Sequence, residues 1–409
     1  MKMAGCTRSA LLTVGLCLTA TLPPDIVVTP WALSRPSITV AANAQDASPS
    51  RRSTVGSRPY VWLSPAEIRD LPITGEPGCD VRCSAAWMLM RNAAASAPAF
   101  PNLSDQDETT GNVVLAKALV AVRLRDPRIA DPLKRQVVSL LRSVVGTEAD
   151  ARALAVGRKL AAYVFSADII DLATIEPQFD ELVFRPWLRS LYRKDLRGRT
   201  LRTCHQDRPN NWGTHCGASR IAVAAYLDDE REIQSAARVF RGWLGDRRSY
   251  ADFTFQPEAL FWIPTCSALQ PSCRPRPINP KGAVVNGHNV DGVIVDDQRR
   301  AGSFTWPPTY TGYSYGALEG AVVQAVVLHR WGFNSWAWSD EALKRAVEWL
   351  FNDEDGKPKW DTCGNTNRRH VLDLIDDGYG TDFLGRMDCP PAPSPPGRNV
   401  AWTSWTHQR

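Results

Sequence analysis

Apolar residues recur at spacings of three and four along most of the chain from Val61 onward, which is the pattern of helices with one buried face. Few stretches alternate apolar and polar residues, so the sequence predicts no long strands. The predicted helices cover residues 111–125, 132–145, 151–173, 178–193, 218–227, 232–244, 315–331 and 340–351. Gly332 is a suitable residue to end the helix before it, and Ser339 is a good N-cap for the next one.

Residues 254–308 interrupt this helical pattern with many proline, glycine and asparagine residues. An irregular region this long inside a compact domain is usually functional. Many helices in one domain, with the loops gathered at one end, fit an α/α toroid. We therefore predict an all-α fold, an incomplete α/α barrel whose long irregular loops form a cleft, with residues 61–409 as a single domain.

The N-terminus has the features of a secretory signal. Lys2 and Arg8 precede an apolar run, residues 10–18, that is too short to span a bilayer. Residues 42–44 (Ala-Asn-Ala) offer a cleavage site far from that run, and cleavage near Ala20 is the alternative. We assign residues 1–44 to the leader and a flexible segment, and the Ser/Arg-rich residues 45–60 to a disordered mature N-terminus. No later window is apolar enough to span a membrane, so we expect a secreted or periplasmic protein with no membrane association after leader removal.

Cysteine usage agrees with export. Two cysteines fall in the leader, and the other eight form local clusters, which argues for disulfides in an exported chain. Sequence cannot fix the connectivity, but neighbouring cysteines suggest the pairs Cys79–Cys83, Cys204–Cys216, Cys266–Cys273 and Cys363–Cys389. Zinc is the competing explanation, but Cys79-x3-Cys83 has no matching second pair with histidines, so we predict no metal site.

Composition and charge narrow the partner. The formal net charge is +5 at pH 7 without long runs of Lys or Arg, so nucleic acid is not the expected partner. A modest positive balance suits a polyanionic ligand held in one local cleft. The chain has 15 tryptophans, which commonly line sugar-binding clefts, although core packing is the alternative for most of them. We expect a monomer.

Three blocks concentrate polar side chains beside apolar segments. They are NNWGTHCGASR (210–220), then DG (291–292) with DDQRR (296–300) and YSYGAL (313–318), and finally WTSWTH (402–407). The first lies just before the small-residue helix 218–227, where an unpaired buried amide costs about 1–3 kcal/mol, so it indicates a docking site. In this order, over roughly residues 85–407, the blocks resemble the alginate-lyase-like polysaccharide lyases. The resemblance implies an α/α toroid that cleaves a uronic-acid polymer, either mannuronate-rich alginate or glucuronan, by β-elimination without a metal or organic cofactor.

Elimination on a uronate makes three chemical demands. The carboxylate must be neutralised, a base must remove the C5 proton, and an acid must protonate the departing O4. The resemblance assigns neutralisation to Asn211, the second residue of the family's Asn-Asn motif, with Asn210 and Trp212 as substrate-binding neighbours. The structural alternative is that the two asparagines only cap the following helix or form an Asx-turn.

The chain departs from the best-known alginate lyases at one position. Those enzymes carry His directly after the Asn pair, where this chain has Trp212. His215 lies three residues later and could substitute, but His288, in a polar Gly-rich loop, is the better catalytic candidate. A satisfied structural hydrogen bond is the alternative for either histidine.

The second block supplies the candidate arginine and tyrosine. Arg300 is favoured over Arg299 to face the substrate carboxylate, because guanidinium forks match carboxylates, although salt bridges to the preceding aspartates are a simpler explanation. The resemblance places a catalytic tyrosine near the start of the following helix, and Tyr313 is the first choice, with Tyr310 and Tyr315 as reserves. A phenol needs cationic neighbours to act as a base, and Arg300 and His288 are suited to provide them. One tyrosine can serve as base and acid if elimination is syn.

Three other functions compete with the lyase. An inverting glycoside hydrolase on the same toroid needs two carboxylates about 6.5–9.5 Å apart. Its candidates are Glu258, Asp291, Asp296 and Asp297. A non-catalytic envelope protein would bind polyuronate without cleaving it. Residues 312–316 also match G-x-S-x-G, with Ser314, Asp376 and His407 in the chain order of a hydrolase triad, but no strand is predicted before the turn.

Overall fold

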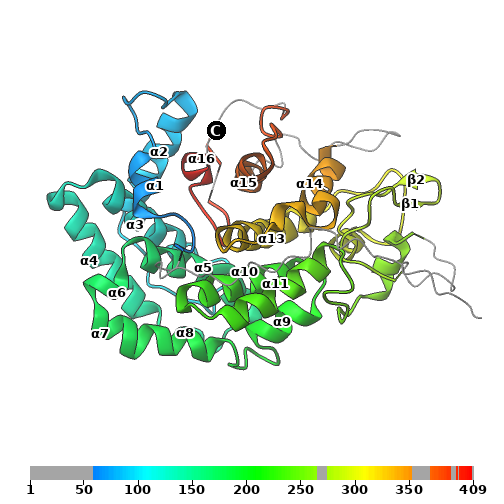
Figure 1. Ribbon diagram of the computed structural model, residues 1–409, viewed down its shortest axis with the longest axis horizontal. Coiled ribbons are helices and arrows are strands. Elements are labelled where there is room, and N and C mark those ends of the chain that lie inside the picture. The colour runs from blue at the N-terminus through cyan, green and yellow to red at the C-terminus, as the bar shows by residue number, and fades with distance from the viewer. Residues whose placement is uncertain (1–58, 265–273, 352–368, 388–392, 395, 408–409) are drawn as a thin grey trace, which may run out of the picture. The chain divides into compact units, whose positions relative to one another are not determined.

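The computed structural model describes residues 59–264, 274–351, 369–387, 393–394 and 396–407, and these are mostly helical (Figure 1). The predicted all-α class is confirmed at this level. Backbone contacts divide the chain into Met1–Asp46 and Ala47–Arg409, and every described residue belongs to the second unit. The predicted leader, residues 1–44, and all but the last two residues of the segment 45–60 lie outside the described residues.

The α-helices are α1 (Pro65–Asp70), α2 (Val81–Ala95), α3 (Thr110–Leu124), α4 (Pro127–Val144), α5 (Ala153–Ile169), α6 (Leu172–Ile175), α7 (Pro177–Phe179), α8 (Arg185–Leu191), α9 (Leu201–Asp207), α10 (Asn211–Leu227), α11 (Glu230–Leu244), α12 (Val295–Gln298), α13 (Tyr313–Arg330), α14 (Trp338–Phe351), α15 (Arg369–Tyr379) and α16 (Thr403–Thr406). The π- and 3-10-helical turns are η2 (Asp180–Phe184), η3 (Pro257–Trp262), η5 (Arg299–Ala301) and η6 (Ser335–Ala337). Strands β1 (Val284–Val285) and β2 (His288–Asn289) pair antiparallel, with Val285 opposite His288. The part of the chain that is described thus contains no long strand, as the sequence predicted.

Helices α5, α10 and α13 form the buried centre of the unit. Nearly every residue in each of them is buried. Helix α10 packs against α5 on one side and α13 on the other, while α3 packs on α5 and α15 packs on α13. Because these helices are surrounded, they carry apolar and small residues around most of their circumference rather than along one stripe.

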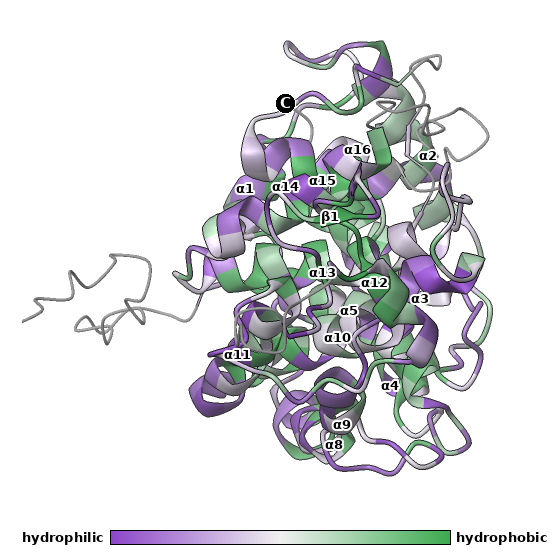
Figure 2. Ribbon diagram, turned by 90° about the vertical axis from the view of Figure 1, so that its right-hand side faces the viewer, coloured by the Kyte–Doolittle hydropathy of each residue, from purple (hydrophilic) through white to green (hydrophobic). Residues whose placement is uncertain are grey.

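Outer helices cover this row with one face each. In α11, Ile233, Ala236 and Phe240 are buried at the helical spacing of three and four, and charged residues occupy the other face. Helix α11 packs on α10 and α14, and α4 packs on α3. In Figure 2 the outer helices α8 and α9 carry purple bands, whereas α13 is largely green.

Glycines allow the central helices to approach each other closely. A Cβ at Gly320 of α13 would lie 2.4 Å from the carbonyl carbon of Thr214 in α10. A Cβ at Gly157 of α5 would lie 2.9 Å from the backbone nitrogen of Cys216, on the other side of α10. Helix α10 is therefore held between two glycine contacts, and its start cannot shift without moving its neighbours.

The helix predicted at 218–227 begins earlier than expected. Asn211 is its first residue, so the NNWGTHC block forms the cap and first turns rather than a loop before the helix. Asn210 is the N-cap, and its side-chain oxygen accepts a hydrogen bond from the Trp212 N–H at 3.1 Å. Glycine disfavours helices, so Gly213 and Gly217 hid the true start. Both are needed for packing, since added Cβ atoms would lie 2.0 Å and 2.6 Å from neighbouring atoms.

Three further helix boundaries were predicted wrongly. The helix expected at 132–145 begins at Pro127 after the N-cap Asp126, and Pro132 lies inside it. The helix expected at 151–173 ends at Ile169, because Asp171 takes a left-handed conformation with φ 57°. Ser339 is not an N-cap, since residues 339–341 form a left-handed turn.

The remaining long prediction, residues 178–193, is helical but contains an irregular turn. Its helical path runs through α7, the π-helical η2 and α8. Pro186 lacks the backbone N–H that a regular helix would direct to the fourth preceding carbonyl, which favours a wider turn there. Gly332 does follow the end of α13, with φ 86°, as predicted for a terminating glycine.

Two of the four predicted disulfides are present. Cys79 is bonded to Cys83 next to the start of α2, and Cys204 of α9 is bonded to Cys216 of α10. The second bond ties the first turns of α10 to α9. The predicted pairs Cys266–Cys273 and Cys363–Cys389 lie outside the described residues.

The block WTSWTH packs into the core rather than lining a cleft. The indole N–H of Trp402 donates to the Asn112 carbonyl, and that of Trp405 donates to the Pro72 carbonyl. Thr403 and Ser404 both donate to Asp373 of α15. The block therefore fastens α16 to the start of the fold. None of the described helices is long and apolar enough to cross a membrane.

Candidate active site

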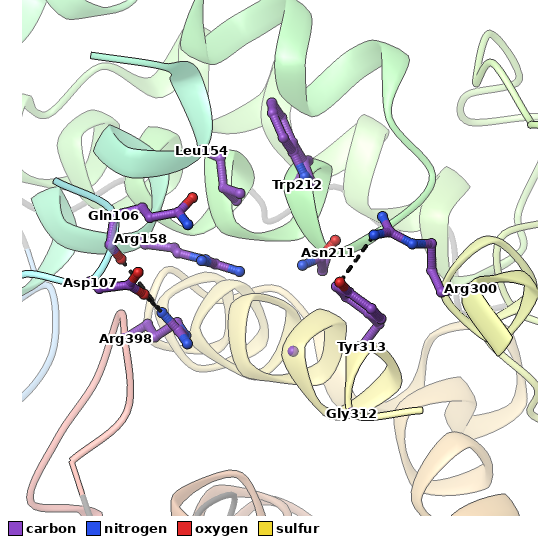
Figure 3. Close-up of a pocket in the computed structure, with 11 residues that line it drawn as sticks. Gln106, Asp107, Leu154, Arg158, Asn211, Trp212, Arg300, Gly312, Tyr313 and Arg398 are labelled. Carbon is purple, nitrogen blue, oxygen red and sulfur yellow. Dashed lines mark hydrogen bonds and ion pairs between the residues drawn. The ribbon is translucent and has the colours of Figure 1, made fainter. Parts of the chain in front are cut away.

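One cavity, of ≈ 560 Å³, brings together residues from distant parts of the sequence (Figure 3). Its lining consists of Gln106, Asp107, Leu154, Arg158, Asn211, Trp212, Arg300, Gly312, Tyr313, Gly316 and Arg398. It contains two of the three sequence blocks, and a volume of this size is typical of a ligand site.

Three central helices begin at this cavity. Leu154 lies at the start of α5, Asn211 is the first residue of α10, and Tyr313 is the first residue of α13, whereas Gln106 and Asp107 lie in the segment before α3. A helix N-terminus carries the equivalent of about half a positive charge and unpaired backbone N–H groups. The cavity is therefore placed where three such ends favour a negative ligand.

Arginines reinforce this positive character. Arg158, Arg300 and Arg398 contribute to the lining, and Asp107 is the only carboxylate among the described lining residues. The side chain of Asp107 is paired with Arg398 at 2.6 Å. The cavity has the charge expected for an acidic ligand.

Tyr313 and Arg300 form a second polar pair in the cavity, beside Asn211. An Nη atom of Arg300 donates to the Tyr313 hydroxyl oxygen at 3.0 Å, and the Arg300 guanidinium carbon lies 4.1 Å from the ring centre. Tyr313 is 39% exposed, so its hydroxyl is within reach of a ligand. The pair therefore places a positive charge directly beside an accessible phenol oxygen.

Asn211 supplies an amide with no partner inside the described part of the chain. Its side chain is 3% exposed and lies against α13, with Nδ2 3.7 Å from the position of a Cβ built on Gly316. None of the described residues hydrogen-bonds this amide, although the backbone N–H of Asn211 is bonded. A nearly buried amide without a partner is costly unless a ligand pairs with it.

Two adjacent aspartates hold the two adjacent asparagines. Asp297 accepts the Asn211 backbone N–H at 3.1 Å, and Asp296 accepts the Asn210 side-chain amide at 2.6 Å. Arg299 pairs with Asp296 at 2.9 Å. Burial raises the pKa of Asp297 well above its usual range, the bond from Asn211 opposes this, and the charge of Asp296 raises it further. The second block therefore fixes the position of the first.

The opposite end of the cavity contains a second charged group (Figure 3). The Arg398 backbone N–H donates to buried Glu319, which fixes the residue that presents the guanidinium. Lys159, next to Arg158 in α5, donates to the Glu108 carbonyl. Burial lowers the pKa of Lys159 to about 8, and the charge of Glu108 opposes that shift.

The two predicted histidines do not line the cavity. His215 is fully buried on α10, and its Nδ1 lies 3.2 Å from the Asn399 amide oxygen when that amide is oriented to satisfy its neighbours. His288 is on β2, and its ring stacks on Trp306 with centres 4.1 Å apart. Their surroundings are those of packed side chains.

Four other predicted substrate-binding residues are also outside the lining. Asn210 caps α10, Arg299 pairs with Asp296, and Tyr315 is buried on α13. Tyr310 is 38% exposed but does not line the cavity. Of the site residues predicted from the sequence, four line the cavity: Asn211, Trp212, Arg300 and Tyr313.

The alternative serine triad is not assembled. Ser314 is buried at the start of α13, while Asp376 accepts bonds from Thr381 and from the backbone of Phe383 and Leu384. The His407 ring packs on Trp62 with centres 5.0 Å apart. No hydrogen bond joins the three triad candidates to one another.

Five lining residues were not identified from sequence: Gln106, Asp107, Leu154, Arg158 and Arg398. Arg158 could have been identified from the sequence, because Arg158 and Lys159 interrupt an otherwise apolar helix. Buried charged side chains need polar partners or a polar cavity. Leu154 is an ordinary apolar helix residue, and Gln106, Asp107 and Arg398 lie in irregular segments whose position depends on the complete fold.

Neither a protein-family model nor a curated protein matches this chain. Among the described residues, no group of three His, Cys, Asp or Glu side chains is arranged to hold a metal ion.

Proposed function

We propose that this protein is a polysaccharide lyase that cleaves a 1,4-linked polyuronate, mannuronate-rich alginate or glucuronan, by β-elimination in this cavity. The observation that carries the proposal is the Arg300–Tyr313 pair beside the Asn211 amide, in a cavity lined by arginines. These groups correspond to the chemical demands of the reaction: a base, a cation that activates it, and a donor for the substrate carboxylate.

In the proposed mechanism, the Asn211 amide donates to the uronate carboxylate and makes the C5 proton more acidic. The Tyr313 oxygen, as a phenolate stabilised by Arg300, removes that proton. The same hydroxyl then returns the proton to the departing O4, as a syn elimination requires. We assign neither step to His288 or His215, because neither lines the cavity.

We further propose that the fold is an α/α toroid. The support is the direction of its central helices, α5, α10 and α13, which all begin at one cavity. Asn211 and then Thr214 of α10 meet Gly316 and then Gly320 of α13, and Cys216 and then Ser219 of α10 bond to Ala153 and then Gly157 of α5, so the three helices run the same way. Chain segments between them must return on the outside, where α11 is packed with one face buried. An inner row of parallel helices with outer returns is the arrangement of a toroid.

Export to the periplasm or the medium is part of the proposal. The two disulfides support it, because disulfides persist mainly in oxidising compartments. Such a location would bring the enzyme to extracellular polyuronates.

The hydrolase alternative has weaker support. It needs two carboxylates, and the described lining contains only Asp107, which is paired with Arg398. Of its four candidates, Asp296 and Asp297 are fully buried, Asp291 pairs with Arg345, and Glu258 lies on η3 outside the lining. A binding protein without activity would use the same cavity, so product chemistry must decide.

The deciding experiment mixes purified protein separately with polymannuronate, polyguluronate and glucuronan, and follows ultraviolet absorbance and reducing ends. Elimination creates an unsaturated, absorbing uronate together with each new reducing end. Reducing ends without absorbance would replace the lyase with a hydrolase. Binding without either product would leave a polyuronate-binding protein.

A further inference from the structure

The cavity has two cationic ends, and the proposed reaction uses only one of them. Figure 3 shows Asn211, Arg300 and Tyr313 at one end, and Arg158, Arg398 and Asp107 at the other. Both groups line the same cavity of ≈ 560 Å³. In the proposed mechanism the carboxylate of one uronate is held at Asn211, and that sugar does not require the second group.

Arg158 and Arg398 are built into that second end. Arg158 is 9% exposed although it lines the cavity, so its charge is held near the ligand rather than in solvent. The backbone of Arg398 is fixed by buried Glu319. Arginine pairs well with carboxylates because its planar donors match both oxygens.

Asp107 has the properties of a replaceable partner. Its carboxylate bonds Arg398 at 2.6 Å, yet its side chain is 65% exposed. An ion pair this exposed contributes little free energy, so an incoming carboxylate can take its place on Arg398 at small cost. The nearby charges of Lys159, Glu108 and Glu319 are buried behind the lining, where they interact with one another and the backbone.

We propose that Arg158 and Arg398 bind the acidic group of a sugar adjacent to the one held at Tyr313, with Asp107 occupying Arg398 until substrate arrives. This inference rests on the proposed lyase function. It names the residues that would make the enzyme prefer polymers with a carboxylate on every sugar over polymers in which acidic and neutral sugars alternate.

The test compares the wild type with Arg398→Gln and Arg158→Gln on two substrates. One is a polyuronate, and the other is the same polymer after partial reduction of its carboxyl groups, so that most remaining uronates have neutral neighbours. On the charged polymer, each variant should lose about 10- to 100-fold in kcat/KM, the usual worth of a charge-assisted bond. On the reduced polymer, kcat/KM of the wild type should fall by a similar factor, because the neighbouring carboxylate is missing. The kcat/KM of the variants should fall no further, because they have already lost that contact. Arg142→Gln on α4, which breaks an ion pair with Glu176, is the matched control and should change neither value of kcat/KM.

Asp107→Asn provides a second test, in which substrate binding is expected to improve rather than to weaken. Asp107 is exposed, so this test does not require the substitution of a buried residue. Removing the competing carboxylate should lower KM for the charged polymer by about two- to fivefold. A purely structural ion pair would instead make both Asp107→Asn and Arg398→Gln harmful. Equal losses for the arginine variants on both polymers, or no loss on either, would overturn the proposal.

Failure of the elimination reaction can be separated from failure of this subsite. If wild type cleaves no polymer, calorimetric titration with uronate oligomers replaces kinetics. Weaker binding by the arginine variants and tighter binding by Asp107→Asn would then support the subsite alone. Unchanged affinity in all variants would overturn it.

Discussion

Tyr313 and Arg300 show how a weak acid becomes useful through one neighbour. An isolated phenol has a pKa near 10 and is a poor base at neutral pH. The Arg300 guanidinium lies over the Tyr313 ring and donates to its oxygen, so the proposed base has a positive charge directly beside it. The exposed position of the pair lets these contacts act on a substrate.

Tyr313→Phe should therefore abolish most activity while leaving the fold intact. Removal of a proton-transfer group typically costs 10²–10⁴-fold in rate, so we expect a fall of about that size in kcat. Thermal stability should change little, because the hydroxyl has only the Arg300 bond among its described neighbours. Tyr310→Phe, at the other exposed tyrosine, should retain activity. If Tyr310→Phe lost activity and Tyr313→Phe kept it, the base would be Tyr310 instead.

We expect Asp297 to hold Asn211 in place, and we expect its carboxyl group to do so in the protonated, neutral form. Asp297→Asn keeps an acceptor for the Asn211 N–H and should be tolerated, whereas Asp297→Ala leaves that buried N–H unpaired and should cost about 1–3 kcal/mol. Because the folded pKa is raised, the wild type should lose stability as pH rises from the usual aspartate range through that raised pKa. Urea unfolding at several pH values should show that loss in wild type and not in Asp297→Asn. An identical pH slope in both proteins would contradict a raised pKa at Asp297.

The residues of the site were predictable to different degrees. Asn211, Trp212, Arg300 and Tyr313 were found because they lie in short blocks of polar and aromatic residues. His215 and His288 shared that local pattern but face other side chains, and residue type alone does not reveal orientation. Arg398 enters the cavity from a segment far along the chain, so only the complete fold brings it there.

At the scale of elements, the contact between α10 and α13 places Asn211 opposite Tyr313. The spacing of that contact is set by Gly320, which meets the backbone of Thr214. A glycine at this point is costly for an isolated helix, by about 1 kcal/mol relative to alanine, but it permits the close approach.

Gly320→Ala should consequently destabilise the protein although alanine is the better helix former. Separating the helices should cost about 1–3 kcal/mol, and activity should fall as Asn211 and Tyr313 move apart. Gly316→Ala in the same helix is the matched comparison for stability, because its Cβ would meet nothing closer than 3.7 Å. Chemical unfolding of the two variants measures the difference. Equal stability would show that the α10–α13 contact can relax.

Helices were predicted well where one face is apolar and poorly where chemistry or close packing overrides propensity. Residues 232–244 match α11 closely because its buried stripe is regular. The early turns of α10 were missed because glycine, histidine and cysteine resemble a loop, and their helical state depends on α5 and α13. The proposed toroid depends on contacts between helices far apart in the sequence, which no local pattern encodes.

At the scale of the whole molecule, one surface ion pair joins distant parts of the chain. Glu67 of α1 receives two bonds from Arg330 at the end of α13, at 2.8 and 2.9 Å. Although burial raises the pKa of Glu67, bonds from Arg330 and Ser64 outweigh it and lower the pKa to about 2. This pair therefore connects the start of the described chain to the central row.

Acid should weaken that connection. Because the folded pKa lies below the unfolded value of 4.5, the stabilisation is present above pH 4.5 and is lost as pH falls toward 2. Glu67→Gln should be less stable than wild type near neutral pH, and the difference should shrink across this interval. Thermal melts from pH 7 to 2 test it, with Glu341→Gln, whose partner Lys344 lies on the same helix, as a local-pair control. A difference independent of pH would contradict the role of the Glu67 charge.

The irregular region after residue 274 is tied together by its backbone despite its lack of long helices or strands. Asn279 N–H bonds the Val293 carbonyl at 2.9 Å, Val290 N–H bonds Ala283 at 2.9 Å, and Val295 N–H bonds Pro277 at 3.0 Å. The buried Asn279 side chain donates to two further carbonyls. In hydrogen–deuterium exchange, these amides should resemble those of a core helix rather than those of a lid, because solvent reaches them only when the segment unfolds. The segment that leads to Arg300 would then be ordered before substrate arrives, and binding would not have to offset the entropy of ordering it.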